Sequence, residues 1–171
     1  MDGSTLVKEE TPGESRLLGT LVHRLVHRFG FEAAGDPRLS EYARQLIRQE
    51  EAALVIDIAH MTEAAADYYE RLCSRTDVRA LYDGGQTLFE VPFSSVTEGR
   101  RVRGVIDSLV CRPLAGNPSK VGHLTVVELK TGAARPEHRD QVAAYRVAAS
   151  AVFPGATIET ALIYSGHIER F

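Results

Sequence analysis

Most informative in this sequence are the segments Val102-Arg-Gly-Val-Ile-Asp-Ser-Leu-Val110 and Leu124-Thr-Val-Val-Glu-Leu-Lys-Thr-Gly132. Both are rich in the Val, Ile and Leu that are typical of strands. Because side chains alternate across a strand, Glu128 and Lys130 share one face, whereas Asp107 shares its face with apolar neighbours. A buried carboxylate needs a compensating partner, since burial of an unpaired charge is costly. Lys130 or a metal ion would be that partner.

The pattern outside these segments predicts alternating blocks of helices and strands. Apolar residues at helical spacing begin near Ser15, and Gly30 is a plausible C-cap. The predicted helices cover about residues 15–29, 38–53, 59–75 and 136–152, and the predicted strands cover 87–93, 102–111, 123–130 and 157–164. We expect a hairpin turn at 97–100 and a longer polar loop at 113–122. The order ααα-βββ-α-β predicts an α/β (α+β) domain with a small mixed sheet.

Length and composition indicate one globular domain. The chain has 171 residues, of which 44% are hydrophobic and 25% charged, which is ordinary for a folded domain. Residues 1–14 lack periodicity, and we interpret them as a flexible leader or linker remnant before a domain at 15–171. The two cysteines, Cys73 and Cys111, are too few for a disulfide scaffold, and we expect packed thiols.

The charge and the apolar runs limit the classes of partner. Twenty Lys and Arg residues against 23 Asp and Glu residues give a formal charge of -3. Any binding to nucleic acid must therefore be local, metal-assisted or supplied by another domain. No apolar run reaches the length of a membrane helix, and the polar start is unlike a signal peptide. We expect a soluble, cytoplasmic protein without a membrane partner.

Asp107, Glu128 and Lys130 together indicate metal chemistry. Each has a simpler interpretation alone, because Glu128 and Lys130 could form a surface ion pair and Asp107 could begin a turn. Two acids on neighbouring strands beside a lysine, however, match the oxygen ligands that Mg²⁺ takes together with substrate phosphates. The joint pattern therefore favours a divalent cation site.

Gly104-Val-Ile-Asp107 followed by Val127-Glu128-Leu129-Lys130-Thr131-Gly132 resembles the core of the PD-(D/E)XK nucleases. The chain is most similar to the nuclease domain that accompanies RecB/AddA-type helicases. Further segments match in the family's order over about residues 17–165. They are Leu18-Gly19-Thr20-Leu-Val-His23-Arg24, Phe89-Glu90-Val91-Pro92-Phe93, Gln141-Val-Ala-Ala-Tyr145 and Ala161-Leu-Ile-Tyr164.

The resemblance implies a restriction-endonuclease-like core with an N-terminal helical segment, and a set of site residues. His23, Asp107 and Glu128 would ligate Mg²⁺ or Mn²⁺ together with the backbone carbonyl of Leu129. Lys130 would orient or deprotonate the attacking water. Three further side chains would line the site: Glu90, Gln141 and Tyr145.

The implied activity is metal-dependent hydrolysis of DNA, as a single strand or a duplex end. The resemblance also implies a helicase motor in the same full-length chain or complex, acting in end processing, recombination or repair. The chain departs from its relatives in three ways. Glu128 stands where they more often have Asp, the four cysteines of an iron–sulfur cluster are missing, and no G-x-x-x-x-G-K-[ST] phosphate loop occurs.

Three alternatives remain open on the sequence. The domain could be a catalytically degenerate nuclease fold that binds DNA or a protein partner, although intact Asp107, Glu128 and Lys130 argue against it. His23 and His27 have the H-x-x-x-H spacing of zinc sites, but Arg24 stands where those sites have glutamate. The arginines of the first two helices are interpreted as a solvated face that could also touch phosphates. They are Arg24, Arg28, Arg44 and Arg48.

Overall fold

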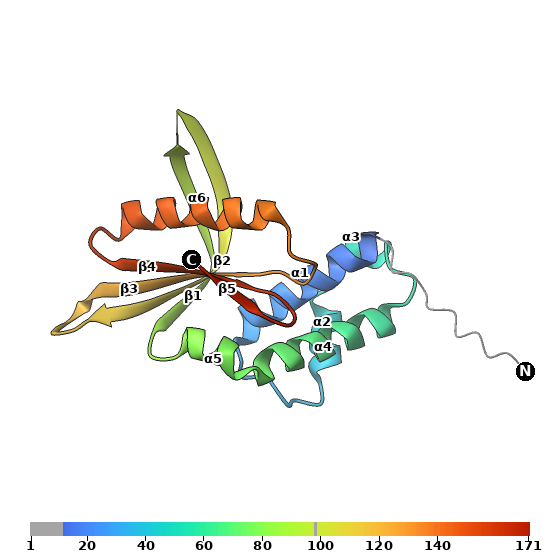
Figure 1. Ribbon diagram of the computed structural model, residues 1–171. Coiled ribbons are helices and arrows are strands. Elements are labelled where there is room, and N and C mark those ends of the chain that lie inside the picture. The colour runs from blue at the N-terminus through green and yellow to red at the C-terminus, as the bar shows by residue number, and fades with distance from the viewer. Residues whose placement is uncertain (1–11, 98) are drawn as a thin grey trace, which may run out of the picture.

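A computed structural model describes residues 12–97 and 99–171 (Figure 1). Its helices are α1 (Pro12–Phe29), α2 (Leu39–Gln45), α3 (Gln49–Ala52), α4 (Ile58–Ser74), α5 (Thr76–Tyr82) and α6 (Pro136–Val152). Its strands are β1 (Gln86–Thr97), β2 (Arg100–Leu114), β3 (Asn117–Leu129), β4 (Thr157–Ile163) and β5 (Ile168–Arg170). The leader predicted at 1–14 lies outside the described residues, except that residues 12–14 begin α1.

The strands form one mixed sheet in the order β1-β2-β3-β4-β5. Only β3 and β4 pair in parallel, and α6 is the crossover between them, as a parallel connection requires. The remaining pairs are antiparallel. Helix α6 covers one face of the sheet, and α1 and α4 lie on the other side (Figure 1). The predicted mixed α+β class with a sheet flanked by helices is confirmed.

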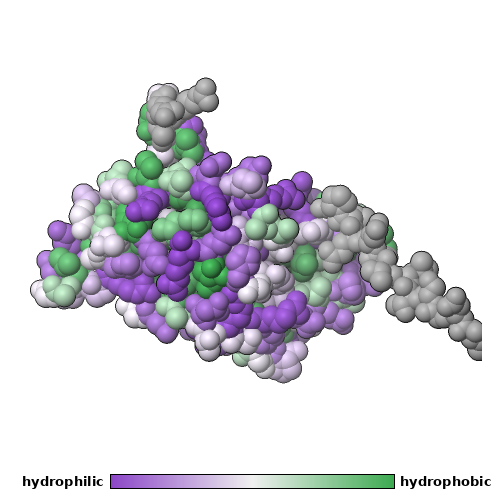
Figure 2. All heavy atoms as spheres, in the orientation of Figure 1, coloured by the Kyte–Doolittle hydropathy of each residue, from purple (hydrophilic) through white to green (hydrophobic). Residues whose placement is uncertain are grey.

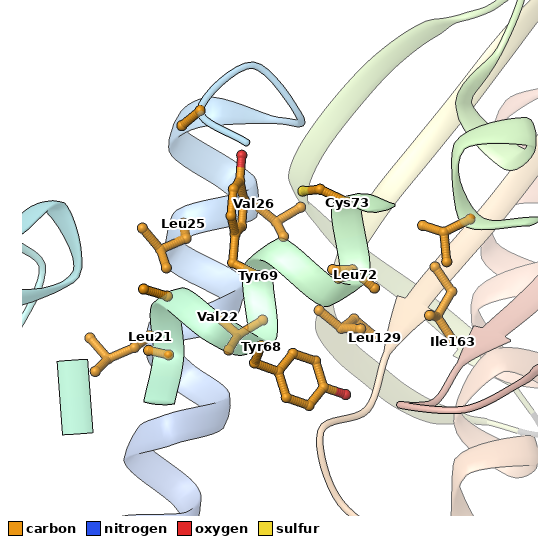
Figure 3. Close-up of a cluster of buried hydrophobic side chains, with 14 of the residues drawn as sticks. Leu21, Val22, Leu25, Val26, Tyr68, Tyr69, Leu72, Cys73, Leu129 and Ile163 are labelled. Carbon is orange, nitrogen blue, oxygen red and sulfur yellow. The ribbon is translucent and has the colours of Figure 1, made fainter. Parts of the chain in front are cut away.

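Two hydrophobic clusters hold the layers together. The helical core packs α1 and α4 against β3 and β4, and it includes Leu21, Tyr69 and Leu129 (Figure 3). The α6 core packs Val142 and Tyr145 against the opposite face of the sheet. Burial of apolar side chains contributes about 25 cal/mol per Å². These two cores therefore fix α1 and α6 on opposite sides of the part of the sheet that carries Asp107, at the middle of β2, and Glu128, near the end of β3.

The single helix predicted at 38–53 is wrong, because the chain forms α2 and α3 with a break between them. The guanidinium of Arg24 lies at this break and donates to the Leu46 carbonyl at 2.8 Å. The same guanidinium bonds to both carboxylate oxygens of Glu51 at 2.6 and 2.7 Å. Arg24 therefore satisfies a free helix-end carbonyl and is not part of a solvated face, contrary to the prediction.

Three other differences concern a predicted loop and two short elements. The polar loop predicted at 113–122 is a hairpin, in which β2 continues to Leu114 and β3 begins at Asn117. Its polar composition misled the prediction because residues 114–120 are solvent-exposed, and the pairing slips at Pro113, which cannot donate to a ladder. The short α5 and β5 were not predicted. The other helices and strands are confirmed with shifted ends.

Strands β1 and β2 change face together at Glu90 and Asp107. Phe89 packs against the helical core, whereas Val91, two residues later, packs in the α6 core. Residues two apart in a regular strand share a face, so the strand must rotate between them. Glu90 has a φ of 51°, and this left-handed conformation provides the rotation.

Beyond this point the β1–β2 hairpin continues as a projecting ribbon, here called the arm and comprising residues 91–97 and 100–106. The arm rises beside α6 in the ribbon view and stands clear of the rest of the surface in the space-filling view (Figures 1 and 2). Across the described residues, no helix is both long and apolar enough to cross a membrane.

Candidate active site

Helix α1 brings His23 to the sheet because Gly19 allows close approach. A Cβ atom at Gly19 would lie 2.7 Å from the Thr131 hydroxyl, which follows β3. A larger residue at this position would require a shift of either the Thr131 side chain or the helix. His23 follows Gly19 by four residues and therefore lies on the same face, one helical turn along. The Gly-Thr-x-x-His pattern is thus a packing requirement as well as a motif.

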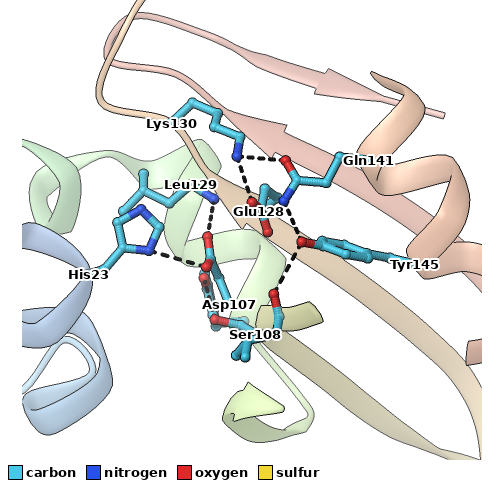
Figure 4. A network of polar contacts seen from close by, with 10 residues as sticks. His23, Asp107, Ser108, Glu128, Leu129, Lys130, Gln141 and Tyr145 are labelled. Atoms are coloured by element: carbon cyan, nitrogen blue, oxygen red, sulfur yellow. Dashed lines mark hydrogen bonds and ion pairs between the residues drawn. The ribbon is translucent and has the colours of Figure 1, made fainter. Parts of the chain in front are cut away.

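Asp107 connects α1 to the end of β3. Its Oδ1 atom lies 3.1 Å from Nδ1 of His23, and its Oδ2 atom accepts the backbone N–H of Leu129 at 2.7 Å (Figure 4). Burial lowers the pKa of His23, but the hydrogen bond and charge of Asp107, with smaller effects of Glu128 and Glu90, raise it above 6.5 overall. The imidazole therefore sits in an environment that favours a positive charge.

Glu90 completes a group of three possible ligands. One ligand atom each of His23, Glu90 and Asp107 lies within 4.8 Å of the others. Glu90 is the only non-glycine residue with a positive φ among those the structure describes. Such strained conformations cost about 1–3 kcal/mol and cluster at functional sites. The strain places a third ligand atom beside Asp107.

Glu128 is buried, and only one of its two carboxylate oxygens has a hydrogen-bond partner among the described residues. Its side chain is 4% exposed, and Oε1 accepts a hydrogen bond from Nζ of Lys130 at 2.7 Å. Its Oε2 atom has no hydrogen-bond partner in the described part of the chain. Burial raises the pKa of Glu128 to about 7, and the charge of Asp107 adds to this rise, whereas Lys130 and His23 oppose it. The carboxylate therefore lacks part of the positive charge that its ionised form needs.

Lys130 is held from the α6 side. Its Nζ atom donates to Oε1 of Gln141 at 2.8 Å, and the Gln141 amide donates to the Tyr145 hydroxyl (Figure 4). The Tyr145 hydroxyl donates in turn to the Val105 carbonyl at 3.1 Å. Gln141 and Tyr145 are one turn apart on α6, so they form one continuous support. The chain of bonds fixes the ammonium group between Glu128 and Gln141.

These residues fit a divalent cation. The donor set is carboxylate oxygen with one imidazole, and the buried, unpaired Oε2 of Glu128 is the kind of atom that a cation would satisfy. Hard divalent cations take such oxygen ligands, and two carboxylates are enough when a phosphate supplies the rest. Glu128 bonds to Lys130, while Glu90 lies with His23 and Asp107.

The site opens into a groove of about 1110 Å³. His23, Glu90, Asp107 and Lys130 line it. Its rim also carries Arg16, Arg48 and Arg135, for which no ion pair occurs within residues 12–97 and 99–171. Four of the predicted site residues therefore line one groove, whereas Glu128, Gln141 and Tyr145 lie behind Lys130 and are joined to it by hydrogen bonds.

A family model for the PD-(D/E)XK nuclease superfamily matches residues 3–167, nearly the whole chain. The chain belongs to the PD-(D/E)XK nuclease superfamily. Members of this superfamily are generally nucleases that use divalent metals, which agrees with the ligand group of His23, Glu90 and Asp107. The predicted superfamily is confirmed at this level.

Other comparisons add little to the superfamily assignment. No curated protein matches the chain. Among solved structures, the crystal structure of protein VC1899 from Vibrio cholerae is similar, with 15% sequence identity and a TM-score of 0.37. The match covers 94% of this chain and 49% of the Vibrio protein, so the chain spans about half the length of that structure.

Two structural features of the candidate site in this PD-(D/E)XK domain are not visible in the sequence pattern. Glu90 was predicted only to line the site, and nothing in an alternating strand pattern signals a left-handed glutamate. The contact between Gly19 and Thr131 joins residues far apart in the chain. The motif around His23 marks the right helix but does not reveal which residue limits its approach.

Proposed function

We propose that this chain hydrolyses phosphodiester bonds in DNA with a divalent cation, Mg²⁺ or Mn²⁺. The observation that carries the proposal is the buried Glu128 carboxylate, which has an unpaired Oε2 atom on the strand next to Asp107 and beside the Lys130 ammonium. An unpaired buried acceptor costs about 1–3 kcal/mol, and a cation bound at Glu128 Oε2 would offset that cost.

The cation would be held by His23, Asp107 and Glu128 with the Leu129 backbone carbonyl, and Glu90 lies close enough to His23 and Asp107 to be a further ligand. A bound divalent cation supplies Lewis-acid chemistry, which polarises a phosphoryl oxygen and lowers the pKa of water. The Leu129 N–H holds Asp107 in place by its bond to Oδ2. This bond leaves Oδ1 directed at His23.

Lys130 is the protein side chain that we assign a catalytic positive charge, in addition to the metal ion. Its ammonium can orient the attacking water and stabilise negative charge that develops on the phosphate. Gln141 and Tyr145 would act as positioning residues, because they hold the ammonium against Glu128 through a continuous line of hydrogen bonds. This positioning does not require either residue to touch the substrate.

The biological setting belongs to the same proposal. The similarity of six motifs to RecB/AddA-type nuclease domains supports a role in DNA end processing, recombination or repair, in the cytoplasm. A net charge of -3 gives the isolated chain little general attraction for DNA. A helicase motor in the same full-length chain or complex would deliver the strand to the groove.

A cleavage assay tests the proposal. Linear single-stranded and duplex DNA are incubated with the chain in Mg²⁺, Mn²⁺ or EDTA, and Asp107→Ala and Lys130→Ala are compared with the wild type. We expect cleavage only with a cation, and a loss of about 100-fold or more in each variant. Either variant cutting at more than about a tenth of the wild-type rate would contradict the assignment. DNA binding without any cleavage would instead support a degenerate nuclease fold.

A further inference from the structure

We propose that the arm is a binding surface for the backbone of duplex DNA on one side of the cleavage point. This inference rests on the proposed function for the position of that point, but the contact itself needs no chemistry. The arm would hold phosphates about four to six nucleotides from the scissile bond. The surface concerned is the face of the arm that is turned away from α6.

The two faces of the arm differ sharply in exposure. The face toward α6 carries Val91, Phe93 and Ile106, which pack in the α6 core. The opposite face, here called the outer face, consists of three cross-strand pairs whose side chains are all exposed: Pro92 with Val105, Ser94 with Arg103, and Val96 with Arg101.

The outer face begins at the candidate active site. Ile106 points to the α6 core, and the next residue, Asp107, points the other way to His23 on α1. Alternation along β2 therefore puts Arg101 and Arg103 on the side of the ribbon from which Asp107 enters the site. A strand lying on Asp107 and continuing along the arm would pass these two arginines.

The charge of the outer face is positive and unpaired. Arg101 and Arg103 form no ion pair within the part of the chain that the structure describes, and none of the six outer-face side chains is acidic. The whole chain carries -3, so this local surplus is not a consequence of general basicity. Unpaired arginines spaced along a ribbon suit the repeating phosphates of a nucleic acid.

The base of the arm is fixed against α6, below the residues that carry the arginines. The Phe93 ring lies over Gly104, where a Cβ atom would be 2.7 Å from the ring, and its centroid is 5.1 Å from that of Tyr145 on α6. The Tyr145 hydroxyl also bonds to the Val105 carbonyl. The same tyrosine thus anchors both the arm and, through Gln141, Lys130.

The spacing and chemistry favour a duplex. At about 3.3 Å per residue, Arg103 and Arg101 lie roughly 13 and 20 Å along β2 from Asp107. A duplex strand rises about 3.4 Å per nucleotide, which gives about four and six nucleotides. The six outer-face side chains include no aromatic ring, whereas surfaces for single strands stack bases on aromatic side chains. The outer face of the arm therefore fits the phosphate backbone of a DNA duplex better than a single strand.

A paired substitution tests the arm in the full chain. The variant is Arg101→Ala/Arg103→Ala, and the matched control is Lys120→Ala/Arg146→Ala, which removes the same charge from exposed positions on β3 and α6. Binding of a labelled 20-base-pair duplex and of a single strand of equal length is measured by fluorescence anisotropy in EDTA over a salt series. Thermal unfolding of both variants checks the fold.

We expect the arm variant to bind the duplex roughly ten- to fiftyfold more weakly near 0.1 M salt, and the slope of log K against log salt to fall by about 2. The control should match the wild type within about threefold, and single-strand binding should change little. An unchanged slope, an equal loss in the control, an equal loss on the single strand or no duplex binding by the wild type would each overturn the proposal.

Hydrolysis separates this inference from the proposed function. With Mg²⁺ or Mn²⁺, the arm variant should keep the wild-type rate on bis-p-nitrophenyl phosphate, a diester too small to reach the arm, and should show a raised KM on the duplex. If the wild type hydrolyses neither substrate, the nuclease assignment fails while the binding result still supports the arm. An equal loss on the small diester would mean damage to the active site and would overturn the arm's role.

Discussion

Glu90 lies across from Asp107 at the one place where β1 and β2 both change face. The bridged pairs Phe89 with Ser108 and Val91 with Ile106 enclose them on either side in the same register. The left-handed φ of 51° at Glu90 thus coincides with the residue that stands opposite the central acid of the site. The strained backbone at Glu90, the rotation of β1 and β2, and the position of the Glu90 carboxylate beside Asp107 therefore all occur at this pair of residues.

Replacement of Glu90 should therefore trade stability against metal binding. Glu90→Gly relieves a left-handed conformation that costs about 1–2 kcal/mol in L-residues, less the extra chain entropy that glycine loses on folding. We expect its metal-free free energy of unfolding to rise by about 1 kcal/mol, or about 2–4 °C in Tm. The stabilisation by Mn²⁺ should shrink.

The matched control is Glu90→Gln, which removes the charge but keeps the strain. It should lose Mn²⁺ stabilisation as Glu90→Gly does, without the gain in metal-free Tm. If Glu90→Gly is less stable than the wild type in EDTA, the strain at this position has been misjudged. Full Mn²⁺ stabilisation in both variants would remove Glu90 from the ligand group.

Gly19→Ala should displace His23 through a contact with Thr131. The added Cβ atom would meet the Thr131 hydroxyl at 2.7 Å, while the other Thr131 atoms nearby are 3.8 and 3.9 Å away. A shift of about 1 Å in a catalytic group can cost up to 100-fold in rate. We expect a cleavage loss of roughly tenfold or more in Gly19→Ala. Gly19→Ala/Thr131→Ala should recover most of the activity, because only the hydroxyl blocks the new methyl group.

Thr131→Ala alone is the control, and it should cleave DNA at near the wild-type rate. A double variant as impaired as Gly19→Ala would show that the glycine acts through helix flexibility or backbone contact rather than through the space beside Thr131.

The sequence predicts the order of elements well where hydrophobic periodicity is long. Helices α4 and α6 were placed within one residue at each end, because each buries a continuous apolar stripe. The break between α2 and α3 depends on a distant partner, Arg24, and cannot be read from local propensity. Strands β1, β2 and β3 extend beyond their predicted ends for a related reason. The additional residues are mostly exposed, so their sequence shows no alternation of buried and exposed positions.

In the candidate site, too, the sequence predicts which residues take part but not the contacts that depend on tertiary packing. The motifs predict that His23, Asp107 and Glu128 share one site. In the structure His23 lies beside Asp107 and Glu128 bonds to Lys130, while the group of three possible ligand atoms contains Glu90 and not Glu128. Which acid faces which partner is set by three-dimensional packing. Glu128 pairs with Lys130 and leaves one oxygen unpaired, and the rotation at Glu90 moves that side chain beside His23. Neither arrangement has a signature in residue spacing.

His23 and His27 should differ strongly in metal binding. His23 bonds to Asp107 at 3.1 Å, whereas His27 is exposed one turn further on, with its ring centroid 6.5 Å from that of Phe89. His23→Ala should lose most of the Tm increase that Mn²⁺ gives and most of the cleavage, and His27→Ala should keep both. Any advantage of Mn²⁺ over Mg²⁺ should also shrink without the His23 imidazole. Equal losses in the two variants would instead favour a histidine-pair zinc site.

The stability of the metal-free protein should fall between pH 4.5 and 7 because of Glu128. Its pKa is raised from 4.5 to about 7 in the folded state, mainly by burial. Between these values the folded state binds more protons than the unfolded state, so the free energy of unfolding decreases as the pH rises. The destabilisation is complete above about pH 7, where the buried carboxylate must ionise.

Glu128→Gln isolates this contribution, since the amide has nearly the same shape and does not titrate. In urea unfolding with EDTA, we expect the stability of Glu128→Gln relative to the wild type to increase steadily from pH 4.5 to 7 and then to level off. At pH 8, Mg²⁺ should raise the Tm of the wild type much more than that of Glu128→Gln, because a ligand that binds only the folded state stabilises it by mass action. A stability difference that does not change with pH would mean that Glu128 ionises as easily in the folded protein as in water. An equal Mg²⁺ effect in both proteins would place the cation away from the unpaired oxygen of Glu128.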